Sequence, residues 1–306
     1  MPFTLIKGTF RLVNETQNGA ETGFEPDGDS IHFRPDDSSL LDELTQLDKP
    51  YRLTNIGSVM LRFEGIDALE LHYSPSHGGH ETHQPRPLGD AARDFLTGEL
   101  DLNPVPYAPP RNLRVKPPVD RDATPGYILS RSLEVHGRPV SFVFAGEAPE
   151  NDGAQVVLKV PRFRRSLNYK LVENGFAYPL FYDTLFIDLR EALIQAVESA
   201  RQSNFGIWNE DLTMSGVTAT SQAKLEADGV VFPKLFRRLT DYLAQTSGGL
   251  GDFKDWLAAM NERVQDINPD SPTFTNNTGY DTFIKVQGNK VKMTQRPEHV
   301  VFISDK

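Results

Sequence analysis

The sequence predicts an α+β fold. Apolar and polar residues alternate over residues 4–13 and 58–66, which is typical of half-buried strands, and residues 140–144 form a compact apolar run. Apolar residues recur with helical spacing over residues 88–96 and 189–202. With 306 residues, the chain is long enough for two modest domains, each with its own core.

The first third of the chain predicts three strands. Residues 4–13 read as a first strand, and a polar loop over 14–23 follows. Residues 31–33 return as the second strand. The acidic insertion 36–50 contains a short helix at 40–44. Residues 58–66 form the third strand.

The middle of the chain predicts loops around one helix and then further strands and helices. A Gly- and Pro-containing loop at 74–87 precedes the helix 88–96, and a Pro-rich insertion spans 103–125. This insertion is expected to be ordered rather than to serve as a polyproline docking segment. The later elements are strands near 127–135, 140–145 and 156–160 and a helix over 189–202.

The last ninety residues carry a separate pattern. Two amphipathic helices are predicted at 232–244 and 253–267 around the turn 247–251. A hairpin follows, with strands at 282–286 and 290–293, and a last strand at 300–303. We therefore expect a domain over 1–215, with insertions at 36–50, 74–87 and 103–125, and a small helical and β-hairpin appendage over 216–306.

Charge is unevenly distributed along the chain. The chain carries 32 Lys and Arg against 42 Asp and Glu, a net charge of −10, while residues 216–306 hold 11 of each sign. The whole excess therefore lies in the first 215 residues. Because phosphate neutralisation dominates nucleic-acid affinity, an acidic domain predicts weak binding of such a polyanion.

Three short segments carry residues suited to phosphate chemistry. Arg62, Asp67 and Glu70 follow one another along a strand and the turn after it. Asp29 lies in the turn Asp27-Gly28-Asp29-Ser30, and Arg138 follows Gly137 before an apolar strand. Together they offer two acids for a cation, one acid for a base and two arginines for a phosphate.

These motifs resemble those of the staphylococcal nuclease (thermonuclease) family. The family reads D-G-D-T, then R-L-x-x-V-D-T-P-E, then Y-G-R-x-L-A-Y, and the order and spacing match here. Two further segments, 167–177 and 204–211, resemble the family's helix before G-L-A and its L-N-I-W-S-E-D end. The resemblance covers residues 1–212; the remainder resembles no family.

The resemblance implies a five-stranded Greek-key β-barrel of the OB type with helices packed on it. It implies hydrolysis of DNA or RNA, with Asp29 and Asp67 as ligands of Ca²⁺. Mg²⁺ or another divalent cation is the alternative metal. Ala68 stands where the family has Thr, which is compatible with a main-chain carbonyl ligand. Glu70 is expected to be the general base, and Arg62 and Arg138 to be catalytic arginines that hold the phosphate. Tyr182 is the expected platform for a base.

Each of these residues also has a plainer reading. Asp29 fits an ordinary hairpin turn; Glu70 fits a solvated surface acid; Arg62 fits an ion pair with Glu64 or Glu70; and Arg138 fits a turn arginine. The alternative for the whole domain is a non-catalytic module that binds nucleic acid or protein, although the presence of all five site residues favours an enzyme.

The histidines of one loop are a further metal candidate. His72, His77, His80 and His83 lie close in sequence, but the Gly- and Pro-rich loop does not fix a ligand geometry, so a solvated and mobile rim is expected.

Targeting features are sparse. The first residues lack a basic region followed by a long apolar one, and no stretch reaches a membrane span, so a cytoplasmic protein without membrane contact is expected, with secretion as the alternative. There is no cysteine, which excludes disulfides. Residues 216–306 are the candidate surface for a protein partner.

Overall fold

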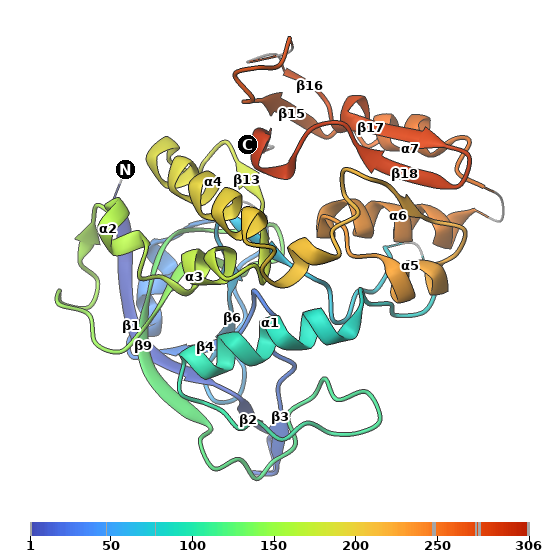
Figure 1. The fold of residues 1–306 in the computed structure, drawn as a ribbon. Coiled ribbons are helices and arrows are strands. Elements are labelled where there is room, and N and C mark those ends of the chain that lie inside the picture. The colour runs from blue at the N-terminus through green and yellow to red at the C-terminus, as the bar shows by residue number, and fades with distance from the viewer. Residues whose placement is uncertain are drawn as a thin grey trace. The chain divides into compact units, whose positions relative to one another are not determined.

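The computed structural model describes residues 2–46, 48–76, 78–246, 249–272, 274 and 277–304. These residues form the strands and helices drawn in Figure 1. They divide into two compact units. The first unit is Met1–Glu64 with Ala91–Leu171, and the second is Gly65–Asp90 with Val172–Lys306. The α+β class is therefore confirmed, while the predicted domain boundary near residue 215 stays a prediction.

A nearly closed, barrel-like sheet builds the first unit. Its strands in sheet order are β6 (Val59–Met60), β4 (His32–Pro35), β1 (Phe3–Arg11), β9 (Ala123–Leu133), β10 (Pro139–Ala145) and β7 (Arg62–Phe63). Leu61 alone separates β6 from β7 in the chain. Because β6 pairs with β4 and β7 pairs with β10, this one segment links the two ends of the sheet.

Aromatic side chains fill the inside of this sheet. Phe3 meets Phe142 edge to face with ring centroids 5.4 Å apart, and Phe10 lies 5.0 Å from Phe33. All four rings are buried, as is Phe63. The predicted strands at 4–13, 31–33 and 140–145 are thus confirmed by β1, β4 and β10. The strand predicted over 58–66 is instead divided into β6 and β7, and Ile66 begins another strand, which belongs to the second unit.

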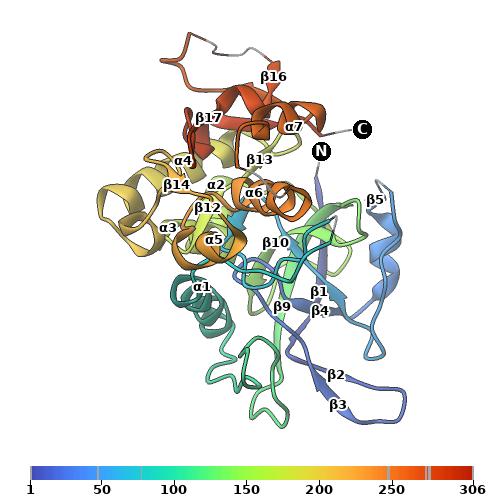
Figure 2. The ribbon, with the colours of Figure 1, turned by 90° about the vertical axis from the view of Figure 1, so that its right-hand side faces the viewer.

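Shorter elements decorate the first unit. They are β2 (Val13–Glu15), β3 (Glu21–Gly23), η1 (Ser38–Glu43), β5 (Thr45–Gln46), β11 (Gln155–Val156) and α2 (Val160–Phe163). Figure 2 shows the β2–β3 hairpin in dark blue. The short helix predicted at 40–44 is the 3-10 helix η1, which begins at the cap Asp37.

The Pro-rich insertion 103–125 is ordered, as expected. Tyr107 and Val115 form a β-bridge, and the Arg93 guanidinium lies 3.7 Å from the centre of the Tyr107 ring. Arg93 comes from α1 (Arg86–Glu99), the helix predicted at 88–96.

The second unit contains three small sheets and most of the helices. The sheets in strand order are β12 (Ala177–Pro179) with β8 (Ile66–Ala68); β13 (Phe181–Tyr182), β19 (Val300–Phe302), β15 (Arg263–Asp266) and β16 (Asn277–Gly279); and β14 (Val217–Thr218), β18 (Lys290–Met293) and β17 (Ile284–Gln287). The helical elements are α3 (Leu167–Glu173), shared with the first unit, α4 (Ile187–Gln202), η2 (Gly206–Asn209), α5 (Gln222–Asp228), α6 (Pro233–Gln245), α7 (Phe253–Ala259), η3 (Tyr280–Phe283) and η4 (Pro297–His299).

The C-terminal prediction is confirmed except at one helix. Helix α6, the hairpin of β17 and β18, and strand β19 lie where the sequence predicts them. The helix predicted over 253–267 is wrong beyond residue 259. There, α7 ends and Asn261 takes a left-handed φ of 52°, which stops a helix, before the chain continues as β15. The predicted turn 247–251 lies partly outside the described residues.

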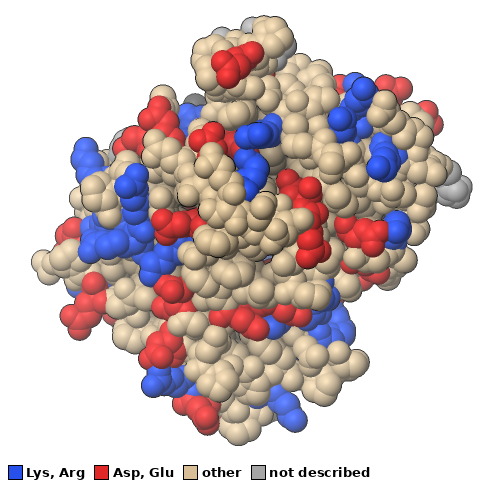
Figure 3. All heavy atoms as spheres, in the orientation of Figure 1, with Lys and Arg blue, Asp and Glu red and all other residues tan. Residues whose placement is uncertain are grey.

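Surface charge and membrane features can be stated for the described part of the chain. On the face shown in Figure 3, basic and acidic side chains are interspersed, so neither sign covers it continuously. Within the described ranges, no helix combines the length and apolar composition that crossing a bilayer requires.

Candidate functional site

Strand β8 and the turn after it hold the predicted acids Asp67 and Glu70. Asp67 lies opposite Tyr178 of β12, and its side chain is only 5% exposed. The backbone N–H of Glu70 donates to Oε1 of Gln84 at 3.2 Å. Gln84 is fully buried and donates in turn to the carbonyls of Gly229 and Val231, at 2.7 and 2.8 Å. The turn bearing Glu70 is therefore fastened to the segment that leads into α6.

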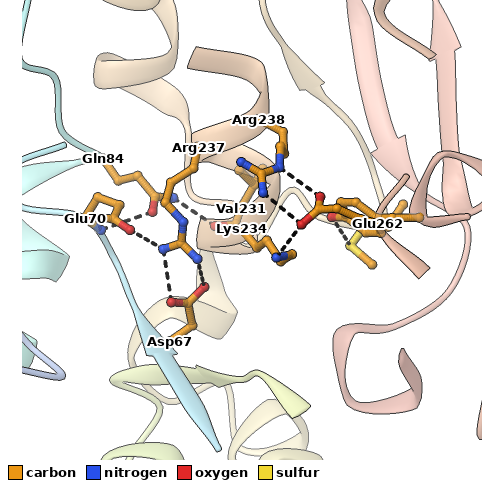
Figure 4. Close-up of polar contacts among 10 residues, drawn as sticks. Asp67, Glu70, Gln84, Val231, Lys234, Arg237, Arg238 and Glu262 are labelled. Atoms are coloured by element: carbon orange, nitrogen blue, oxygen red, sulfur yellow. Dashed lines mark hydrogen bonds and ion pairs between the residues drawn. The ribbon is translucent and has the colours of Figure 1, made fainter. Parts of the chain in front are cut away.

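Arg237 of α6 binds both acids. Its Nη1 and Nη2 donate to the two oxygens of Asp67 at 3.1 and 2.9 Å, and Nη1 also donates to Oε1 of Glu70 (Figure 4). Burial lowers the pKa of the Arg237 guanidinium, but the charges of Asp67 and Glu70 outweigh burial and raise that pKa well above its usual range. The guanidinium is therefore permanently charged in this environment.

A second ionic group on α6 flanks Arg237 in the chain. Lys234 and Arg238 both reach Glu262, with Lys234 Nζ 2.8 Å from Oε1 and Arg238 donating from Nε and Nη2 at 2.8 Å each (Figure 4). Although burial raises the pKa of Glu262, these cations lower it overall to about 2. The helix that carries Arg237 is thus anchored independently of Asp67 and Glu70.

The predicted arginines Arg62 and Arg138 lie in the first unit, Arg62 on β7 and Arg138 in the turn that leads into β10. Arg62 of β7 is opposite Val140 of β10, and Arg138 precedes β10 directly. Arg138 Nε donates to Oε1 of Glu134 at 3.2 Å. Burial raises the pKa of Glu134, but Arg138, and to a lesser extent Arg62, outweigh burial and lower it overall. Arg138 therefore contacts this carboxylate directly within one turn, and the charge of Arg62 also favours its ionised form.

Asp29 lies in a tight turn beside the strand of Arg62. The N–H of Asp27 donates to the carbonyl of Ser30 at 3.1 Å, which closes the turn. The carbonyl of Asp29 accepts from the N–H of Phe63 at 3.2 Å. The backbone of Asp29 is therefore that of an ordinary hairpin turn. Its side chain is half-buried, and its role as a metal ligand stays a prediction.

The remaining predicted residues belong to the second unit. Ala68 is buried opposite Ala177. Tyr182 lies opposite Phe302 in the sheet, and Lys234 Nζ is 5.8 Å from the centre of its ring. Tyr182 thus has an aromatic and a cationic neighbour, and its role in base stacking stays a prediction.

The histidine loop contacts helices α5 and α6. Tyr73 Oη donates to Asp241 at 2.9 Å, and Thr82, which is buried, donates to Glu226 at 2.7 Å. His77 lies outside the described residues, while His80 and His83 contact Glu226 and the Gln84 carbonyl. Residues 78–81, which include His80, are exposed, so the expected solvated rim is found there. Helices α5 and α6 supply partners for Thr82 and Tyr73, and the mobility of the loop stays a prediction.

The acids as arranged do not fit a divalent cation. Both oxygens of Asp67 and one oxygen of Glu70 accept from Arg237, whereas Ca²⁺ needs six to eight oxygen ligands that are free to turn toward it. In the described ranges, no group of three or more His, Asp or Glu side chains is placed to hold a metal.

Arg237 is the residue that sequence reasoning missed. It lies 170 positions from Asp67, in a segment outside the family resemblance. Its one sequence sign is the pattern Lys234, Arg237, Arg238, which puts three cations on neighbouring faces of an amphipathic helix whose apolar side is buried.

Comparison with protein-family models and with curated proteins gives no match for this chain.

Proposed function

We propose that this protein is a phosphodiesterase that hydrolyses nucleic acid. The observation that carries the proposal is that Arg62, on β7, lies opposite Val140 of β10, while Arg138 directly precedes β10, so both arginines lie near the start of the same strand pair. Each guanidinium can bind a phosphate through two N–H groups, and two arginines from neighbouring segments could hold one phosphate together.

We further propose that the barrel is of the OB type. The pairing order β1, β4, β6–β7, β10, β9 and back to β1 supports this, as does the parallel pairing of β7 with β10. An OB barrel is a five-stranded, partly open Greek-key barrel that commonly binds oligonucleotides. Since fold alone does not decide function, the residues carry the argument.

In the proposed reaction, Glu70 takes a proton from the attacking water. Arg62 and Arg138 stabilise the charge that develops on the phosphoryl oxygens. Tyr182 would stack a base of the substrate. A metal at Asp29, Asp67 and Ala68 would take part in this reaction only if Arg237 no longer contacted Asp67.

A second candidate is a non-catalytic module that binds nucleic acid or protein. The observation that favours it is the engagement of both Asp67 and Glu70 by Arg237. Carboxylate oxygens that already accept from Arg237 are occupied, whereas a general base has to accept a proton from a water.

Cleavage of labelled single-stranded DNA and RNA separates the two candidates. The protein is assayed at low salt with Ca²⁺, with Mg²⁺ and with chelator, beside Glu70→Gln and the control Glu173→Gln, which removes an exposed charge from α3. Cleavage lost in Glu70→Gln and retained in Glu173→Gln supports the hydrolase. Binding without cleavage under every condition supports the module.

A further inference from the structure

We infer that Arg237 is the resident cation of the Asp67–Glu70 pair and that it keeps divalent cations from these acids. Asp67 and Glu70 belong to the site of the proposed function. The exclusion of metal by Arg237 does not depend on that function, but its effect on catalysis does. A site whose sequence predicts a metal instead carries a guanidinium supplied by the chain itself.

Arg237 occupies the carboxylate oxygens that a metal bound by Asp67 and Glu70 would use. The guanidinium spans both oxygens of Asp67 and reaches Glu70, so one cation joins the two acids as a bound ion would. The Asp67 side chain is 5% exposed and that of Glu70 14%, so little water is available to replace these bonds. Planar, forked guanidinium donors suit this bidentate contact, and their weak hydration suits burial.

Displacing Arg237 would be costly because its helix is fixed elsewhere. Lys234 and Arg238 bind Glu262, and the α6 residues Leu235, Phe236 and Leu239 are buried. The Asp241 carboxylate, also on α6, accepts from Tyr73 Oη and from the N–H of Ser76, both at 2.9 Å. Arg237 is therefore held in place by its own helix and by the loop after Glu70.

Calcium binding by the full chain tests the inference. Calorimetric titrations compare wild type, Arg237→Met, and the control Arg238→Met, which removes a neighbouring α6 guanidinium that binds Glu262 instead of the acid pair. We expect wild type and Arg238→Met to show no binding that depends on Asp67. We expect Arg237→Met to gain a Ca²⁺ site at least about tenfold tighter than any residual binding by wild type, and Asp67→Asn in that background to abolish the gain.

Two results would overturn the inference. One is calcium binding by wild type that is lost in Asp67→Asn, and the other is a folded Arg237→Met, judged by circular dichroism, that binds no better than wild type. If Arg237→Met does not fold, wild type against Asp67→Asn decides: equal titrations uphold the inference and a loss rejects it. A gain in calcium binding without cleavage in any variant upholds the inference while rejecting the hydrolase.

Discussion

Arg237 and Asp67 form a two-bond ion pair, with Nη1–Oδ1 and Nη2–Oδ2 distances of 3.1 and 2.9 Å, between residues 170 positions apart. The pair connects helix α6 to strand β8, so the C-terminal segment completes the surroundings of the predicted acids. The sequence predicts each partner's element but gives no sign of the contact between them.

Removing Arg237 should destabilise the second unit. Arg237→Met leaves the Asp67 and Glu70 carboxylates buried without a counter-charge, which costs about 3 kcal/mol in comparable buried pairs. Combining it with Asp67→Asn should recover roughly 1–2 kcal/mol, because residues in direct contact are not additive. Urea unfolding of the four proteins measures this, and additive losses would show that the pair contributes nothing.

The pH dependence of stability should carry the mark of Glu262. Its pKa is lowered to about 2 in the fold, below its ordinary value of 4.5, by Arg238 and Lys234 against the effect of burial. A carboxyl whose pKa is lower in the folded than in the unfolded state stabilises the fold at pH values above its unfolded-state pKa. That stabilisation is lost as the pH falls from about 4.5 to 2. The loss is on the order of 3 kcal/mol.

Glu262→Gln provides the comparison for this effect. The variant should be less stable than wild type at neutral pH and should lose less stability between pH 4.5 and 2, as followed by urea unfolding at each pH. Parallel curves for the two proteins would show that Glu262 titrates normally.

Asn168 should be essential for the first unit. Its amide is fully buried, accepts from the N–H of Val143 at 2.9 Å, and donates to the carbonyls of Glu64 and Ser141 at 2.9 and 3.0 Å. Asn168→Ala strands these backbone groups and should lower the free energy of unfolding by about 3 kcal/mol. Asn151→Ala, at an exposed position, serves as the control. Equal stabilities of the two variants would contradict the stabilising role of the Asn168 amide.

The arginines should act through their forked donors rather than through charge alone. Arg62→Lys and Arg138→Lys keep the charge but lose the two parallel N–H bonds, so cleavage should fall by about 100-fold in each. The exposed Arg165→Lys should leave the rate unchanged. Initial rates on a labelled oligonucleotide measure this, and rates within about twofold of wild type would remove both arginines from the proposed reaction.

Much of the first unit could be predicted from its sequence because its strands bury one face. Phe10, Phe33 and Phe63 alternate with polar residues and all lie inside. The helix predicted over 253–267 was wrong at its end because Val264 fits the apolar spacing of a helix as well as that of a strand. The left-handed backbone at Asn261 ends the helix before that residue.

The surroundings of the acids could be predicted only in part. Asp67 and Glu70 are recognisable from local spacing, since they follow Arg62 within eight residues. Their partner Arg237 is brought to them by tertiary packing of α6, which leaves only the helical pattern of its apolar side in the sequence.

A crystal structure determined in excess Ca²⁺ tests the central claim most directly, because it shows which cation lies between Asp67 and Glu70. The account predicts the Arg237 guanidinium within hydrogen-bond distance of both carboxylates and no calcium ion on either. A calcium ion bound to the Asp67 carboxylate, with Arg237 displaced, would contradict it.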